Sequence, residues 1–247
     1  MRATSFKALR NSVLRKMGLD ADQLVLPSQA AAIADYMESS LSDVWGLYDW
    51  PDTTLTETRT PTGTPATSID FRAPGATSIG TILRITDQEP TSARLVQTFS
   101  FAENALSTAA IITDARYTPG TAVHVKFRLP EPRLTSAAYS ASTSYSAGDT
   151  VYHDTTGDCY LALSPTTGNP PTDATFWERQ LIPSIFAPYL RHATHALTLE
   201  EDGQYDKAAV QSAKAENEIV KTHDDIFLRE NNTPLRWTLQ RDTVTPY

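Results

Sequence analysis

The stretch that decides the fold comprises residues 139–177, which read YSASTSYSAGDTVYHDTTGDCYLALSPTTGNPPTDATFW. Its Gly148-Asp149 pair supplies a tight turn, which needs a residue free to adopt positive φ. Two short runs of β-forming residues, 150–152 (TVY) and 160–162 (YLA), flank the turn cluster 154–158 (DTTGD). Aromatic residues at both ends are expected to pack over a core that so few residues cannot otherwise build. We therefore expect a small β-module here.

The expected module, residues 136–180, resembles the small chitin-binding type of carbohydrate-binding module. The resemblance rests on an aromatic residue, a tyrosine, Gly-Asp-x-Val, Tyr-x-Ala and a terminal tryptophan. Its expected core residues are Tyr139, Tyr145, Gly148, Asp149, Val151, Tyr160 and Trp177. Sugar-binding members expose aromatic side chains just after the Tyr-x-Ala element, whereas this chain has LSPTT at 163–167. The resemblance implies the fold of that module without its sugar platform, and such modules also decorate phage tail and neck proteins.

The composition indicates an ordinary chain that can bury a sizeable core. It has 247 residues, of which 40% are hydrophobic and 20% charged, and this balance argues against disorder. The single cysteine, Cys159, excludes an intrachain disulfide and a multi-cysteine zinc site, and we expect it to be half-buried in a strand. No apolar run approaches the roughly 20 residues that cross a bilayer, so no membrane contact is expected.

The formal net charge of −8 is unevenly distributed. Residues 1–17 contain five basic residues and no acidic one, so the remainder of the chain carries −13. A basic start on an acidic body favours contacts between unlike surfaces or with nucleic acid. A solvated helix face explains the same pattern, and the sequence leaves these alternatives open.

Helical periodicity flanks the middle of the chain on both sides. Apolar spacing predicts helices over 4–18 and 28–50, and an antiparallel hairpin of helices over 184–202 and 204–228. The many alanines of this hairpin permit close helix–helix approach. We expect the two flanks, residues 1–51 and 182–232, to form one helical bundle.

The composition changes over residues 52–132, which are rich in threonine and proline and contain alternating apolar residues. Strands are expected over 54–58, 79–85, 95–101, 109–112 and 122–129. In the last of these, Val123, Val125 and Phe127 alternate with polar residues, as in a half-buried strand. The pattern predicts an antiparallel sheet or sandwich, so the fold class is α+β: a helical bundle, a central antiparallel β domain and the inserted β-module.

The last segment, residues 233–247, has a strand pattern with no neighbouring strand in sequence. Leu235, Trp237 and Leu239 alternate with polar residues. Such a segment is suited to extend a sheet on another chain, so we expect an extended C-terminal arm.

The residue patterns of known catalytic motifs are missing from the sequence. There is no Gly-x-Ser-x-Gly elbow, phosphate-binding glycine loop or His-Glu-x-x-His. His192 and His195 lie three apart on a predicted helix, a spacing that suits a metal ligand pair, but such pairs more often face solvent or a neighbouring helix. Cys159 has no histidine that the sequence indicates as its partner. We expect neither enzymatic activity nor a cofactor or metal.

The order of these elements resembles that of the head-to-tail adaptor (connector) proteins of tailed bacteriophages, including the tail tubular A type. Two runs carry the resemblance. Residues 30–50 end in WGLYDW, and residues 186–217 contain FAPYL and YDKAA. In that family the second helix ends in an aromatic-rich connection to the β domain. Its helical hairpin has an alanine-rich second member.

This resemblance implies a structural virion protein in the neck between portal and tail, assembled in the host cytoplasm. A homo-oligomeric ring, typically a dodecamer, would join the portal protein to a tail or nozzle protein. Viral DNA would pass through its channel without sequence-specific contacts. The portal-docking arm would include Leu235, Trp237, Leu239 and Tyr247. The alternatives are another neck protein, such as a stopper or tail-completion protein, or a glycan-binding virion module acting through 136–180.

Overall fold

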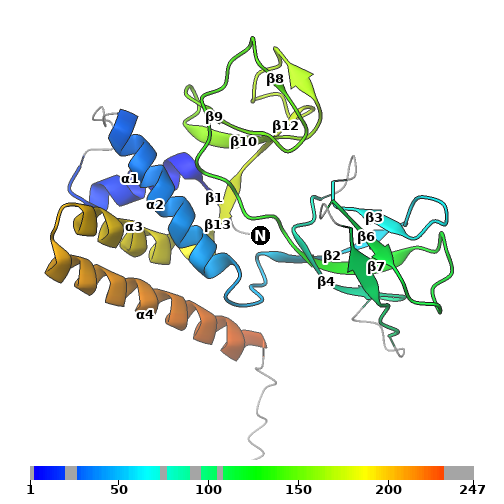
Figure 1. Cartoon of the computed structure of the whole chain (residues 1–247). Helices are drawn as coiled ribbons and strands as arrows, with labels where there is room; N and C mark the ends of the chain where they lie inside the picture. The colour runs from blue at the N-terminus through cyan, green and yellow to red at the C-terminus, as the bar shows by residue number, and fades with distance from the viewer. Residues whose placement is uncertain (1–2, 20–26, 73–76, 90–95, 105–107, 231–247) are drawn as a thin grey trace, which may run out of the picture.

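The computed structural model describes residues 3–19, 27–72, 77–89, 96–104 and 108–230. These residues form a mixed α+β fold in which several antiparallel sheets accompany four α-helices (Figure 1). The helices are α1 (Phe6–Lys16), α2 (Pro27–Trp45), α3 (Ala187–Glu201) and α4 (Tyr205–Glu230), and a short 3-10 turn, η1 (Ser184–Phe186), precedes α3. Within the described ranges, no helix combines the length and the apolar character that a membrane span requires.

The helices predicted from periodicity are confirmed, although α2 ends earlier than expected. It stops at Trp45 rather than at Trp50. Trp50 lies in the connection after the helix and is buried. Its indole Nε1 donates a hydrogen bond to the carbonyl oxygen of Val44 at 2.8 Å. The connection after α2 therefore places an aromatic ring in the core of the helices.

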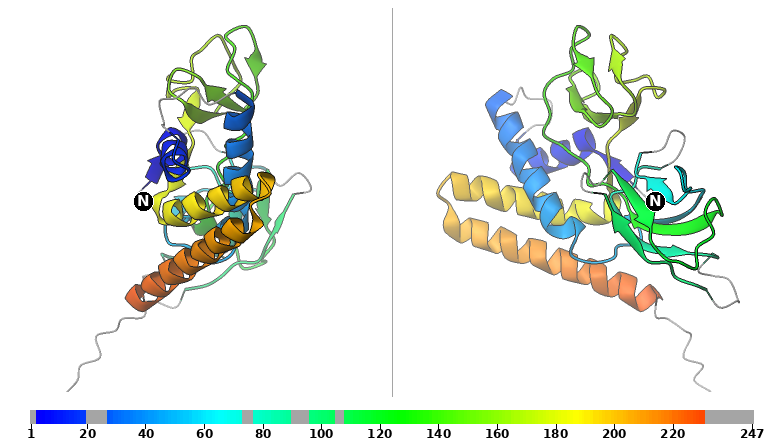
Figure 2. Two further views of the ribbon diagram at one scale, coloured as in Figure 1. Left: turned by 90° about the vertical axis from the view of Figure 1, so that its left-hand side faces the viewer. Right: turned by 45° about the vertical axis from the view of Figure 1, so that its right-hand side comes forward.

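One hydrophobic core is shared by side chains from all four helices. Its buried members include Leu9 and Val13 of α1, Met37 and Leu41 of α2, Phe186 and Leu190 around the start of α3, and Ile219 of α4. Figures 1 and 2 show α3 and α4 lying antiparallel and side by side, as the alanine content predicted. Ala196, Ala208 and Ala215 are buried in this pair, and their small side chains permit close approach of the helices.

The β domain consists of two three-stranded antiparallel sheets over a shared core. Its strands are β2 (Thr54–Arg59), β3 (Ser68–Asp70), β4 (Thr81–Thr86), β5 (Phe101–Glu103), β6 (Ala109–Ile112) and β7 (Val123–Arg128). The sheet orders are β2-β7-β4 and β3-β6-β5, and one cluster contains buried residues from both sheets. The alternation predicted for β7 is confirmed, since Val123, Val125 and Phe127 are buried between half-buried neighbours.

Two details of the β domain differ from the sequence expectation. Of the described residues within 95–101, Thr98 makes an isolated bridge to Thr86 and Phe99 packs into the core, whereas the strand begins only at Phe101. β3 was not expected, because only Ile69 of its three residues is apolar and buried. Short edge strands of this kind depend on their partner more than on their own residues.

The β-module contains β8 (Ser144–Tyr145), β9 (Thr150–His153), β10 (Asp158–Ala162), β11 (Thr166–Thr167) and β12 (Trp177–Arg179). They form a three-stranded sheet, β12-β10-β9, and a two-stranded sheet, β11-β8. The predicted hairpin of 150–152 and 160–162 is confirmed, with Cys159 opposite Tyr152 in the antiparallel register.

A strand pair absent from the sequence expectation ties the N-terminus to the end of the module. β1 (Ala3–Ser5) pairs antiparallel with β13 (Leu181–Pro183), with Thr4 opposite Ile182. This pairing holds the start of α1 next to the start of α3, although about 180 residues separate them in sequence.

Candidate functional surfaces

The aromatic residues of the β-module form its own core. The rings of Tyr139 and Tyr145 stack at a centroid distance of 5.8 Å, and Trp177 meets them edge-on at 6.0 and 5.3 Å. Val151 and Tyr160 complete this cluster. The Tyr139 hydroxyl and the Trp177 indole both donate to the carbonyl oxygen of Asn169. The hydroxyl of Tyr139 and the indole N–H of Trp177 therefore form hydrogen bonds within the module.

The remaining predicted module residues, Gly148 and Asp149, form its tight turn. Gly148 has a φ of 95°, and a Cβ atom there would lie 1.8 Å from Nη1 of Arg72 in the β domain. Asp149 closes the turn by accepting a hydrogen bond from the Ser146 N–H at 2.7 Å. The positive φ thus favours glycine at this position, and the guanidinium of Arg72 occupies the space that a side chain would take.

This arrangement leaves the module without an aromatic platform for a sugar. All of residues 136–180 are described, and every aromatic ring among them is buried or half-buried. The large apolar side chain that they expose is Leu163, at 45%. Because sugar recognition by such modules relies on stacking against flat rings, this geometry does not favour a glycan ligand.

The module is fastened to the helices through its strands β9 and β10. Tyr152 meets the ring of Phe6 edge-on at 6.4 Å and accepts a hydrogen bond from Arg10 at 3.1 Å. Asp158 is buried and accepts from the backbone N–H of Lys7 at 3.0 Å, which caps the start of α1. The module is therefore packed against α1 and is not a separate unit joined to the helices only by the chain.

Cys159 lies at this junction and is fully buried rather than half-buried as expected. It belongs to the core cluster of the helices, and its Sγ–H donates to the carbonyl oxygen of Leu134 at 3.2 Å. Burial, reinforced by the negative charges of Asp158 and Glu38, raises the pKa of the Cys159 thiol to about 12. Since the thiolate is the nucleophile, this environment suppresses its reactivity.

We predict that Cys159 reacts with a thiol-disulfide reagent at pH 8 at least about 100-fold more slowly in the folded protein than in denaturant. Burial blocks access, and the raised pKa keeps the sulfur protonated. The absorbance of the released thiolate measures the rate. Comparable rates with and without denaturant would contradict the burial of this thiol.

Of the predicted histidine pair, His192 contacts neighbouring helices. His192 on α3 lies 2.9 Å from Oε1 of Gln211 on α4 and 2.7 Å from Nζ of Lys16 on α1. His195 is half-buried, and burial together with the positive charge of Lys16 lowers its pKa. No group of three or more potential metal-ligating side chains occurs within the described ranges. His192 therefore joins three helices at one position, whereas Nδ1 of His195 is buried without a hydrogen-bond partner among the described residues.

The most exposed apolar surface of the described residues lies along α4. We define the α4 stripe as Tyr205, Ala209, Ala213, Val220 and Phe227, all exposed and spaced by four or seven residues, so that they share one side of the helix. The large members are strongly exposed: Tyr205 at 70%, Val220 at 51% and Phe227 at 56%. Val210 and Leu228 are also exposed, on a different side of the helix. The helix has 26 residues, so this side is roughly 39 Å long.

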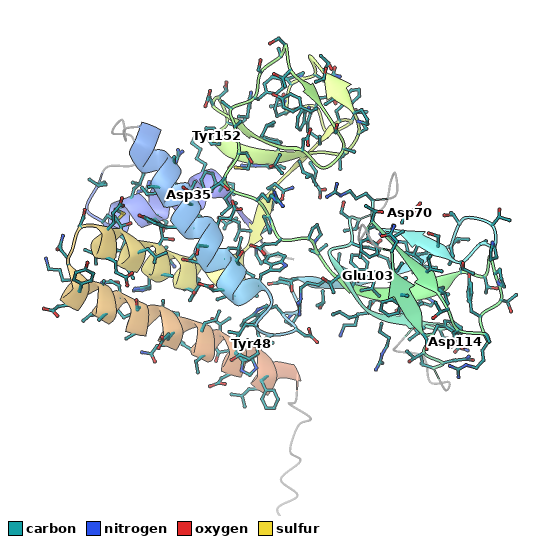
Figure 3. The ribbon with its side chains drawn as sticks, viewed as in Figure 1. Asp35, Tyr48, Asp70, Glu103, Asp114 and Tyr152 are labelled. Atoms are coloured by element: carbon teal, nitrogen blue, oxygen red, sulfur yellow. The ribbon has the colours of Figure 1, made fainter. Side chains whose placement is uncertain are left out.

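An aromatic contact chain holds the C-terminal half of α4 in place. Tyr48, which follows α2, lies beside the C-terminal half of α4 (Figure 3). Its ring stacks on His223 of α4 at 4.0 Å. Tyr48 also meets Trp50 edge-on at 5.0 Å, and Trp50 meets Phe186 at 5.4 Å. The stripe is therefore carried by a helix whose position is set by buried packing.

The predicted docking residues Leu235, Trp237, Leu239 and Tyr247 lie outside the described residues. Comparison with protein-family models finds no match, and no curated protein matches the sequence.

Proposed function

We propose that this protein is a structural component of a tailed-phage virion, a head-to-tail adaptor whose copies form a ring between portal and tail. The observation that carries the proposal is the α4 stripe, an apolar surface on a firmly packed helix. The order of helices, β domain and helical hairpin supports it through the resemblance described above.

An exposed stripe of this length favours a protein–protein contact. Apolar residues that are scattered singly on a surface need no explanation, but aligned ones mark interaction sites. A stripe on one subunit that packs against a different surface of the next generates a closed ring when the rotation closes. In this proposal the helical regions form a bundle that provides the contacts between subunits.

The proposed partners are the portal protein, a tail or nozzle protein and further copies of this chain, with a dodecamer as the expected ring. Residues 233–247 would dock on the portal through Leu235, Trp237, Leu239 and Tyr247. The acidic character of the chain, at −8, suits a channel that lets DNA phosphates pass without adhering. Neither catalysis nor a cofactor is part of this role.

We predict that Val220→Asp prevents assembly, because a carboxylate placed in the stripe would lose its hydration in the interface. The measurement is the mass of the purified chain, alone and mixed with its portal protein. The parent chain is expected to form rings, alone or on the portal, whereas the variant stays monomeric with an unchanged circular dichroism spectrum.

Lys221→Ala is the matched control, since Lys221 is also exposed on α4, outside the stripe, and the change lowers the net charge by one as well. This variant should assemble like the parent. Rings that form equally well with Val220→Asp would rule out the stripe as the contact. Imaged particles without ring density below the portal would reject the adaptor role, and rings with no portal affinity would favour a different neck protein.

A further inference from the structure

An open cleft of about 750 Å³ lies where α2, the β domain and the β-module meet. Figures 1 and 2 show these three parts converging around the segment that follows β7. Its lining includes four apolar residues, namely Trp45, Leu129, Pro130 and Leu161. The size and the position between structural units are typical of a binding cleft.

Three arginines from separate segments line this cleft. Arg72 follows β3, Arg128 ends β7, and Arg133 lies on the connection to the module. Arg72 and Arg133 are exposed, and among the described residues neither forms an ion pair. Arg128 pairs with Asp49 at 2.8 Å, but its Nε is buried without a hydrogen-bond partner. Arg72 Nη1 makes one long hydrogen bond, to the carbonyl oxygen of Ala147 at 3.4 Å. Accessible guanidinium donors thus remain at two points of the cleft, Arg72 and Arg133.

The two carboxylates of the cleft are already used by the protein itself. Oε2 of Glu38 accepts from the backbone N–H groups of Leu134 and Thr135, at 2.9 and 2.7 Å. Glu131 accepts from the hydroxyl of Ser42 at 2.5 Å. These bonds hold the connection against α2, so the acidic groups are held in place, and among the described residues neither forms an ion pair with Arg72 or Arg133.

We propose that this cleft binds an acidic peptide segment of a partner protein, with Arg72 and Arg133 as the main carboxylate contacts. The planar guanidinium fork matches a carboxylate through two parallel hydrogen bonds. The apolar residues of the lining accommodate the aliphatic parts of such a peptide. Nucleic acid fits less well, because its backbone presents phosphates but no aliphatic side chains for the apolar part of the lining. This proposal does not depend on the adaptor role.

Binding of a labelled hexaglutamate peptide to the full-length protein, followed by fluorescence anisotropy at low salt, tests the proposal. The expected result is saturable binding that hexaglutamine does not show. Arg72→Gln and Arg133→Gln should each weaken it about tenfold, the loss expected for one charge-assisted contact. Arg84→Gln, an exposed arginine of the β domain outside the cleft, should bind like the parent.

Circular dichroism and the unfolding midpoint of each variant separate lost binding from lost folding. Arg133 serves this purpose best, since it makes no hydrogen bond with the described residues. Equal binding of hexaglutamine overturns the proposal, as does an equal loss with Arg84→Gln. Tighter binding of an oligonucleotide of the same charge would assign the cleft to phosphates instead and would also overturn it.

Discussion

Replacing Trp50 by alanine is expected to lower the free energy of unfolding by about 3–5 kcal/mol, the range for a fully buried aromatic side chain. Trp50 is 1% exposed and packs edge-on against Tyr48 and Phe186. Removing the ring leaves a cavity between the end of α2 and the start of α3. It also removes the indole donor that bonds the Val44 carbonyl oxygen. Urea denaturation followed by circular dichroism measures the loss.

Leu47→Ala is the control for this prediction. Leu47 lies three residues away in the same connection but is 51% exposed, so its truncation should change the free energy of unfolding by no more than about 0.5 kcal/mol. A loss below about 1 kcal/mol for Trp50→Ala would mean that this ring is not part of the core. Trp50 packs against Tyr48, and Tyr48 stacks on His223 of α4. Trp50→Ala should therefore also loosen the C-terminal half of α4. Faster amide hydrogen exchange there would report that loosening.

Replacing Asp158 by alanine is expected to cost about 2–4 kcal/mol of folding stability. The buried carboxylate accepts from the Lys7 backbone N–H and pairs with Arg179. Its loss leaves the partly buried Lys7 N–H at the start of α1 without this acceptor. Arg179 is half-exposed, so its side chain can turn to water, and the cost stays below that of stranding a fully buried cation.

Two variants distinguish the causes of this loss. Asp158→Asn keeps an oxygen to accept from Lys7 but removes the charge, so it should destabilise the protein less than alanine does. Asp154→Ala removes an exposed carboxylate from the same turn and should be close to neutral. Chemical denaturation of the three variants gives the comparison. If Asp154→Ala proves as harmful as Asp158→Ala, the effect belongs to the turn and not to the cap of α1.

The elements that could be predicted are those whose residue pattern is local, within a few positions along the chain. The helices α1, α3 and α4 follow from apolar spacing, and β7 follows from the alternation of Val123, Val125 and Phe127. The turn at Gly148-Asp149 was readable because few residues tolerate a φ of 95°. The aromatic residues of the module were predicted to share a core, and Tyr139, Tyr145 and Trp177 do lie in one cluster.

The features that were missed depend on partners far away in sequence. Nothing near Asp158 indicates that it caps a helix some 150 residues earlier. The pairing of β1 with β13 has no local pattern either, since each strand has three residues. Arg72 and Arg133 read as ordinary surface residues until the fold brings them to one cleft. The seven-residue spacing of Val220 and Phe227 indicates that both lie on one side of α4. The spacing does not indicate whether that side is buried or exposed.

The sequence by itself therefore determined the mixed α+β class, the helical flanks, the β-rich middle and the aromatic content of the module at 139–177. These follow from helix and strand periods and from turn chemistry, which act over a few residues. Only the tertiary structure decided that the module is fastened to α1, that Cys159 is buried and that one side of α4 stays exposed. Burial and ion pairing depend on which segments contact each other in the folded chain. The local pattern of apolar and polar residues does not specify those contacts.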